Sequence, residues 1–293
     1  MHHATDPRDK VYGVYSIYQR VGLDLPEPDY SKTVAQVYED LTMAIMRYDQ
    51  SLGFLLWTRP PANNKHSLSS WVFDWTSEQN TSPTFSWDDR IYWAKRPPFT
   101  VDTCHLPTQL RLKGRRLGAL EAIGNPFQWE LTYDALRKKE KLIRWVDLTT
   151  TPSSQHRSAE PPGQRSDEAS AEFIAGLLDS RQVWDNAAWI AHQIQNALSD
   201  LAANFDQGAW VGLHRLDGQC LFRLSTGHTG VGHGEAQHSD LVVLVEGAGC
   251  PLILRPDGYH FRFVCAGTVH RVGYGKEWLE NTEVEDLEDF VLV

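Results

Sequence analysis

The C-terminal third of the chain is a run of short apolar segments separated by glycine-rich turns. Between residues 209 and 274 these segments recur at regular spacing: Trp210–His214, Cys220–Leu224, Leu241–Glu246, Pro251–Arg255 and Phe261–Cys265. Such a pattern is typical of antiparallel sheets and small barrels. We therefore expect a C-terminal antiparallel β-sheet or small barrel, against which the rest of the chain must pack.

Two amphipathic helices are predicted at the N-terminal end. In residues 6–20, Asp6 suits the N-cap, Pro7 suits the first turn, and Asp9 can complete a capping box. A second helix is predicted over residues 32–49, where one face carries an apolar stripe at helical spacing: Val34, Val37, Tyr38, Leu41 and Ile45.

The segments that follow are less regular. Residues 53–57 suggest a short buried strand, and residues 58–100, rich in Pro, Asn, Ser and Trp, suggest ordered irregular chain. Residues 110–123 alternate and carry two glycines, which predicts a β-hairpin. A further helix is expected over residues 127–146.

One segment marks a predicted domain boundary. Residues 150–170 have almost no large apolar side chains, so burial cannot offset their ordering entropy, and we expect a disordered linker. It separates residues 1–149 from residues 171–293, which would open with a helical pair at about 171–180 and 182–204. Because helices and strands are grouped rather than alternating, the predicted class is α+β.

Composition excludes several function classes. The 293 residues carry a net charge of −10, whereas nucleic-acid binding and docking to anionic membranes need a basic surface. The four cysteines lack metal-ligand spacing and no apolar run is long enough for a membrane span, so we expect a cytoplasmic protein with reduced thiols. No dinucleotide, phosphate-loop or hydrolase motif is present, and we expect no metal and no cofactor.

Aromatic side chains gather in the irregular segment. Trp71 and Trp75 flank Asp74, and three further rings follow at Trp87, Tyr92 and Trp93. Flat rings with a polar edge suit a pocket for a small organic molecule, with Asp74 as an orienting acceptor or base. Alternatively, the rings only pack a loop-rich region onto the helices.

Other polar residues are candidates for chemistry. His270 titrates near neutrality if unperturbed and could act as an acid or base, or it is a hydrogen-bonded structural histidine. Arg255 could clamp a carboxylate, or pair with Asp257 or with the acidic stretch 277–289. The charged residues at 6–10 could bind an anion or position carboxylates for proton transfer, but helix phase argues against a single site and favours helix capping with surface or interdomain ion pairs.

Three histidines recur at intervals of five in a glycine-rich segment, at His228, His233 and His238. This spacing matches neither a helix face nor one side of a strand, so only a loop could bring them together around a metal. The alternative is an exposed glycine-rich hairpin without ligands.

Several segments resemble the fungal heterokaryon-incompatibility proteins. ATDPRDKVYG (residues 4–13), PDYSKTVAQVYEDL (residues 28–41) and SLSSWVFDWT (residues 67–76) are similar to the family's DPRDKVYALLGL, PDYSKSVEEVYxDF and LPSWVPDWS. Near the C-terminus, residues 230–232, 239–243, 251–255 and 269–270 look like its GLGP, GDxVxxL, PxxLR and YVHG segments. The family's N-terminal effector region is absent, so the resemblance does not carry over a death-inducing activity.

Two functional hypotheses follow. In the first, a scaffold derived from this family binds a small organic molecule in the aromatic pocket and catalyses a cofactor-free cyclisation, isomerisation or elimination, as a lyase- or isomerase-type enzyme. Asp74, His270 and Arg255 would then move a proton or stabilise charge. In the second, the chain is a non-catalytic recognition module that binds a protein partner.

Overall fold

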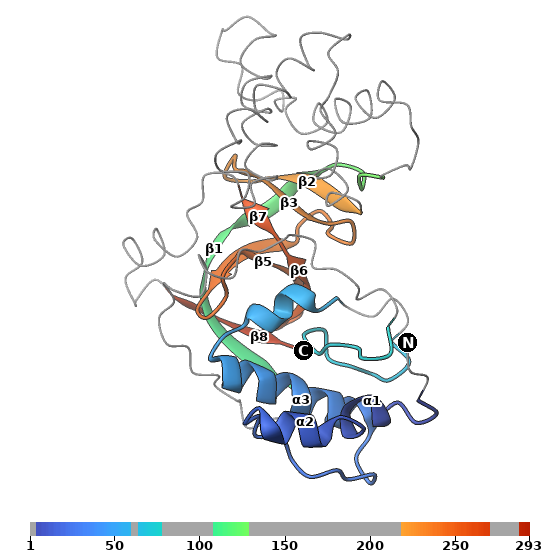
Figure 1. Cartoon of the computed structure of the whole chain (residues 1–293). Coiled ribbons are helices and arrows are strands. Elements are labelled where there is room, and N and C mark those ends of the chain that lie inside the picture. The colour runs from blue at the N-terminus through green and yellow to red at the C-terminus, as the bar shows by residue number, and fades with distance from the viewer. Residues whose placement is uncertain (1–3, 60–63, 78–107, 129–217, 270–286) are drawn as a thin grey trace, which may run out of the picture.

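The computed structural model describes residues 4–59, 64–77, 108–128, 218–269 and 287–293. These form an α+β arrangement in which helices α1 (Asp9–Tyr12), α2 (Tyr15–Arg20) and α3 (Val34–Asp49) lie at one end of a β structure (Figure 1). The strands are β1 (Leu110–Ile123), β2 (Gln219–Leu224), β3 (Thr229–His233), β4 (Leu241–Val245), β5 (Leu252–Asp257), β6 (His260–Ala266), β7 (Thr268–Val269) and β8 (Glu288–Leu292). None of the described helices has the length and apolar character that a bilayer crossing demands.

Several predicted elements fall outside the described residues. They are the linker at 150–170, the helical pair at 171–204, the strand at 210–214 and all but the first two residues of the helix at 127–146. The proposed division into residues 1–149 and 171–293 therefore stays a prediction.

The first predicted helix is interrupted. Residues 6–20 form α1 and α2, with Gly13 and Val14 between them, because glycine lowers helix propensity at that point. The N-cap of α1 is Arg8 rather than Asp6, whose carboxylate instead accepts a hydrogen bond from the Arg8 backbone N–H at 3.0 Å. Asp9 forms no capping box with Asp6.

Helix α3 agrees with the predicted amphipathic pattern. Thr33 is its N-cap and forms a reciprocal capping box with Gln36, and Gln50 ends the helix with φ of 47°. The predicted face is buried at Val37, Tyr38 and Leu41.

The prediction of a strand at residues 53–57 was wrong. These residues form the 3₁₀-helix η1 (Gly53–Trp57), whose start is fixed when the Ser51 hydroxyl accepts from the Gly53 N–H at 2.8 Å. The Leu55 N–H then bonds the Leu52 carbonyl at 2.9 Å, so this segment satisfies its backbone locally instead of joining a sheet.

The predicted hairpin at residues 110–123 is a single strand, β1. Its two glycines permit close approach and a bulge rather than a turn. At Gly114 a Cβ would overlap the carbonyl oxygen of Leu244. Gly118 lies at φ of 157° beside a shift in the pairing with β4, which bends the strand.

The strands β4, β5, β6, β8 and β1 pair in that order, and β1 then pairs with β4, which closes a five-stranded ring. The ring contains strands of the predicted C-terminal sheet, but it also includes β1 from residues 110–123, and it is mixed rather than antiparallel because β6 and β8 run parallel. Figure 1 shows β1 curving from the helices to the β2–β3 hairpin at the opposite end. The C-terminal strand β8 lies between β6 and β1, and not at an edge.

Two apolar clusters fill the described interior. The larger joins α3, η1 and residues 68–75 to the inside of the ring, including Leu112, Phe263 and Phe290. The smaller packs the β2–β3 hairpin against β4, β5 and β6. The N-terminal helices and the ring therefore share one core.

Candidate functional site

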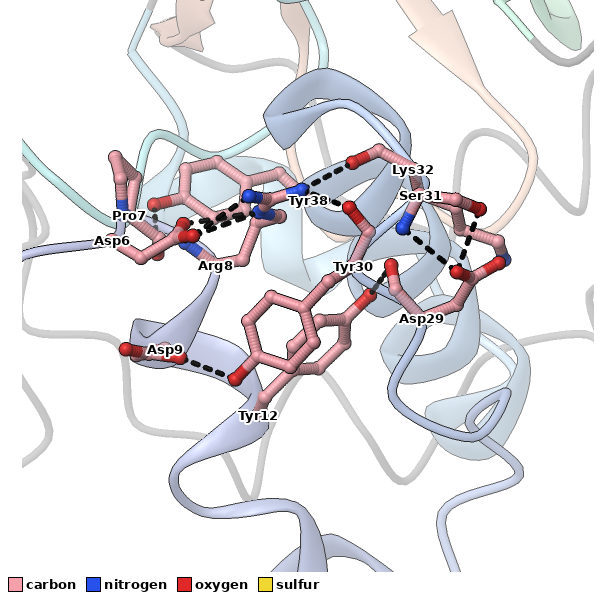
Figure 2. A network of polar contacts seen from close by, with 10 residues as sticks. All are labelled: Asp6, Pro7, Arg8, Asp9, Tyr12, Asp29, Tyr30, Ser31, Lys32 and Tyr38. Carbon is pink, nitrogen blue, oxygen red and sulfur yellow. Dashed lines mark hydrogen bonds and ion pairs between the residues drawn. The ribbon is translucent and has the colours of Figure 1, made fainter.

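A polar network, which we call the motif junction, joins residues 6–12 to residues 29–38 (Figure 2). At its centre Arg8 pairs with Asp6, with Nη2 2.7 Å from Oδ2. The Nη1 group of Arg8 also donates to the backbone carbonyls of Tyr30 and Lys32, at 2.5 and 3.0 Å. One guanidinium therefore fastens the start of α1 to the chain that leads into α3.

Tyrosine hydroxyls complete the motif junction. Tyr30 donates to the carboxylate of Asp9 at 2.6 Å, and Tyr12 donates to the carbonyl of Asp29 at 2.9 Å. Tyr38, in α3, donates to the carbonyl of Pro7 at 2.9 Å. The rings of Tyr12 and Tyr30 meet edge to face, with centroids 5.2 Å apart.

The electrostatics of the junction follow from these contacts. The hydrogen bond from Arg8 lowers the pKa of Asp6, and the bond to Asp9 raises the pKa of Tyr30. Both carboxylates thus act as acceptors within the protein. The predicted alternative of structural ion pairing at residues 6–10 is the one that these contacts favour.

Residues 64–77, which we call the tryptophan segment, pack against the larger apolar cluster. Trp71 is completely buried, and the Asp74 carboxylate accepts from the backbone N–H and the hydroxyl of Thr76, at 2.8 and 2.6 Å. Trp75 is half-buried. Trp87, Tyr92, Trp93 and His270 lie outside the described residues, so their place in a pocket stays a prediction.

Trp75 belongs to a cluster that we call the aromatic face. It stacks on Phe54 with ring centroids 6.1 Å apart, and Phe73 lies 4.8 Å from Trp75 and 5.4 Å from Phe54. Trp57 follows Phe54 by three residues in η1 and therefore projects from the same side of that helix. Trp57 is 46% exposed, and Phe54, Phe73 and Trp75 are half-buried, so part of this aromatic surface meets solvent.

Ser70 connects the tryptophan segment to the ring. Its hydroxyl accepts from the Phe263 N–H in β6 at 2.8 Å and donates to the carbonyl of Val293. The Ser70 N–H bonds the same carbonyl at 3.0 Å. This buried serine thus holds the end of β8 and one strand of the ring to residues 64–77.

Arg255 finds an internal partner that the sequence did not indicate. Its Nε and Nη2 bond the two carboxylate oxygens of Asp240, each at 2.9 Å, and Nη2 also donates to the carbonyl of Glu235. Asp240 is only 2% exposed and also accepts from the Gln237 N–H. The predicted carboxylate clamp is therefore occupied from within the chain, and its role toward a substrate stays a prediction.

The three histidines do not converge. His228 contacts Thr226, His238 contacts Ser239, and His233 ends β3. The segment forms the second strand of the β2–β3 hairpin, whose turn at residues 225–228 is exposed, while Gly230 and Gly232 are buried within β3. Within the described ranges, no three His, Cys, Asp or Glu side chains are placed to hold a metal ion.

Sequence reasoning missed the residues that join distant segments. Tyr38 was predicted only to lie in the apolar stripe of residues 32–49. Ser70 and Asp240 were noted only as positions within the segments that resemble the family, with no role assigned to them. The one available signal was that all three lie in segments that carry the family resemblance.

The comparisons with known proteins agree with that resemblance. No protein-family model and no solved structure matches the chain. The chain is 24% identical over 312 residues to "Heterokaryon incompatibility protein 6, OR allele" of Neurospora crassa. It is related to the heterokaryon-incompatibility proteins.

The alignment covers 86% of this chain and 45% of the Neurospora protein, so the chain spans about half the length of that relative. The resemblance segments at residues 4–13 and 28–41 form the motif junction, and the segment at 67–76 contains Ser70. In the present chain, the described parts of these motifs therefore hold the fold together.

Proposed function

We propose that this chain is a non-catalytic recognition module of the incompatibility type, which binds a protein partner through the aromatic face. The observation that carries the proposal is the contact of Phe54, Phe73 and Trp75, together with the exposure of Trp57, which follows Phe54 by one turn of η1. Aromatic side chains dominate the energetics of protein–protein interfaces because they bury much apolar area with few rotatable bonds. The relationship to an incompatibility protein supports the same class of function.

The bonding of the candidate catalytic groups favours recognition over catalysis. Asp74 is engaged by Thr76 in its own turn, and Arg255 is engaged by Asp240 and Glu235. A general base must be free to reach a substrate proton, and a clamp must have open donors. Such a module would act in the cytoplasm, where its cysteines stay reduced.

A second candidate function is binding of a small organic molecule next to the tryptophans. It is favoured by the indole N–H groups of Trp71 and Trp75, which are buried and have no hydrogen-bond partner in the described chain. A ligand acceptor would satisfy them. A cofactor-free cyclisation, isomerisation or elimination there would further need Asp74, Arg255 and His270 to face that ligand.

The test uses the full chain as bait with two substitutions. Trp57→Ala removes an exposed ring from the aromatic face, and Tyr259→Ala removes a ring that is 99% exposed elsewhere, on the turn between β5 and β6. We expect a partner recovered by the wild-type chain to bind the Tyr259 variant equally and the Trp57 variant at least about tenfold more weakly, the usual scale of a hot-spot ring.

Equal binding by both variants would remove the aromatic face as the contact surface. The small-molecule alternative predicts something different. A thermal-shift screen would then find a compound that stabilises the wild-type chain, and Asp74→Asn would abolish turnover without unfolding the protein.

A further inference from the structure

The chain that leads from α2 to α3 contains a short exposed stretch, Pro26-Glu27-Pro28, which we call the proline segment. All three residues are exposed, and Figure 1 shows the connection between the two helices at the end of the molecule opposite the β2–β3 hairpin. Within the described chain, no backbone hydrogen bond reaches these three residues. The Glu27 N–H and the three carbonyl groups are therefore open to solvent or to a partner.

The two prolines set the backbone conformation of this segment. Proline fixes its own φ at about −65°, and the residue before a proline is confined to extended backbone. Leu25 and Glu27 each precede a proline, and residues 25–29 contain neither a turn nor a bend. These are the features of a short polyproline II stretch, whose backbone makes no internal hydrogen bonds.

Two tyrosine hydroxyls hold the proline segment at its ends. Tyr15 in α2 donates to the carbonyl of Leu25 at 3.3 Å, and Tyr12 in α1 donates to the carbonyl of Asp29 at 2.9 Å. The side chain of Leu25 is also buried. The free stretch is thus fixed at both ends before any partner arrives, which lowers the entropy cost of binding it.

The exposed side chains define what a partner must offer. The ring of Tyr30 is 55% exposed and follows Pro28 by two residues, so two rings are presented close together along the chain. Glu27 is exposed between the prolines and forms no ion pair within the described chain. Grooves lined by aromatic side chains bind polyproline II segments, and basic residues at the rim of such a groove would complement Glu27.

We propose that the proline segment and Tyr30 form a docking site for a protein domain that binds polyproline II chain in an aromatic-lined groove with a basic rim. WW and SH3 domains are domains with grooves of this kind. The negative charge of Glu27 disfavours a nucleic acid or an anionic membrane at the same place. This site shares no residue with the aromatic face, and the proposal does not depend on that face or its partner.

The test measures the affinity of the immobilised full chain for a panel of isolated WW and SH3 domains. We expect at least one domain to bind the wild-type chain, and the double substitution Pro26→Ala and Pro28→Ala to weaken its binding at least about tenfold, because both rings and the preset backbone are lost. Glu27→Lys should also weaken binding and reduce its dependence on salt.

Two matched variants serve as controls. Pro256→Ala removes an exposed proline that pairs with Phe261 in the β5–β6 ladder, and Trp57→Ala changes the aromatic face. Both should bind the domain as the wild type does. In the isotope-labelled wild-type chain, the bound domain should shift the backbone N–H signal of Glu27.

Three results would overturn the docking site. They are no binding by any domain of the panel, equal binding by the wild-type chain and the double proline variant, and a Glu27 N–H signal that does not move when a domain binds. The last measurement needs no substitution, so it decides the question even if the double variant is unstable.

Discussion

Two arginine–aspartate pairs with similar geometry lie in contrasting parts of this molecule. In the N-terminal helical region Arg8 meets Asp6 at 2.7 Å, and both side chains stay partly exposed, at 23% and 31%. In the β region Arg255 meets Asp240 at 2.9 Å, and the carboxylate is only 2% exposed. The environments differ far more than the distances.

This difference shows how each region is held together. Water can solvate the exposed pair if it is broken, so the motif junction depends on many weak bonds acting together. Water cannot reach Asp240 in the same way, so breaking its pair with Arg255 leaves a buried charge. The following predictions test that contrast, from the largest expected effect to the smallest.

Arg255→Met should destabilise the protein most, by about 3–5 kcal/mol, because it leaves the Asp240 carboxylate buried and unpaired. The free energy of unfolding in urea is the measurement. Combining it with Asp240→Leu should restore part of the loss, since the double variant has no buried charge. A loss below about 1 kcal/mol in Arg255→Met would mean that Asp240 is solvated, as at an exposed pair.

Glu39 in α3 should make the protein less stable as the pH rises. Burial raises its pKa from 4.5 to about 7, so the folded state holds a proton that the unfolded state releases between these values. Stability contributed by this group is present below pH 4.5 and falls by about 3 kcal/mol by pH 7. Glu39→Gln should remove this dependence, and an unchanged profile of unfolding free energy against pH would contradict the burial of a charge here.

His233 in the β region should have the opposite effect, making the protein less stable as the pH falls. Its pKa is lowered from 6.5 to about 4, so the unfolded state takes up a proton first as the pH falls. Stability should decline by up to about 3 kcal/mol between pH 6.5 and 4, and His233→Gln should flatten this acid decline. Urea unfolding of both chains across that range tests it. A decline that persists in the variant would assign the acid sensitivity to other groups.

Arg8→Lys should have the smallest effect. Lysine keeps the charge but cannot bond Asp6 and the carbonyls of Tyr30 and Lys32 together. We expect a lower Tm than for the wild type, but a smaller decrease than for Arg255→Met, and a difference that shrinks further in about 1 M NaCl, where exposed charges are screened. A decrease as large as that of Arg255→Met would mean that the two regions do not differ.

Local patterns in the sequence were enough to locate α3 and the strands β2, β4, β5 and β6. The stripe from Val37 to Leu41 has helical spacing, and the runs around Val242 and Ile253 are long enough for buried strands. Both signals act over a few neighbouring residues. They were therefore visible without any knowledge of the partners.

Other errors came from partners far away in the chain. Gly114 seemed to mark a turn because its neighbour Leu244, whose backbone leaves no room for a Cβ, is 130 residues later. Likewise, β8 could not be placed inside the ring from its own residues, because its position depends on pairing with both β6 and β1. The Arg8–Tyr30 and Arg255–Asp240 contacts were not predicted for the same reason.

Hydrogen exchange in Ser70→Ala, with Ser69→Ala as the matched control, tests the central claim that the motif segments fasten the helical region to the ring. Ser69 contacts only the carbonyl of Thr108 through its hydroxyl in the described chain, whereas Ser70 bonds both Phe263 and Val293. We predict that Ser70→Ala speeds amide exchange in α3 and β6 by a similar factor, while Ser69→Ala leaves both protected. Faster exchange at Phe263 alone, with α3 unchanged, would contradict the claim.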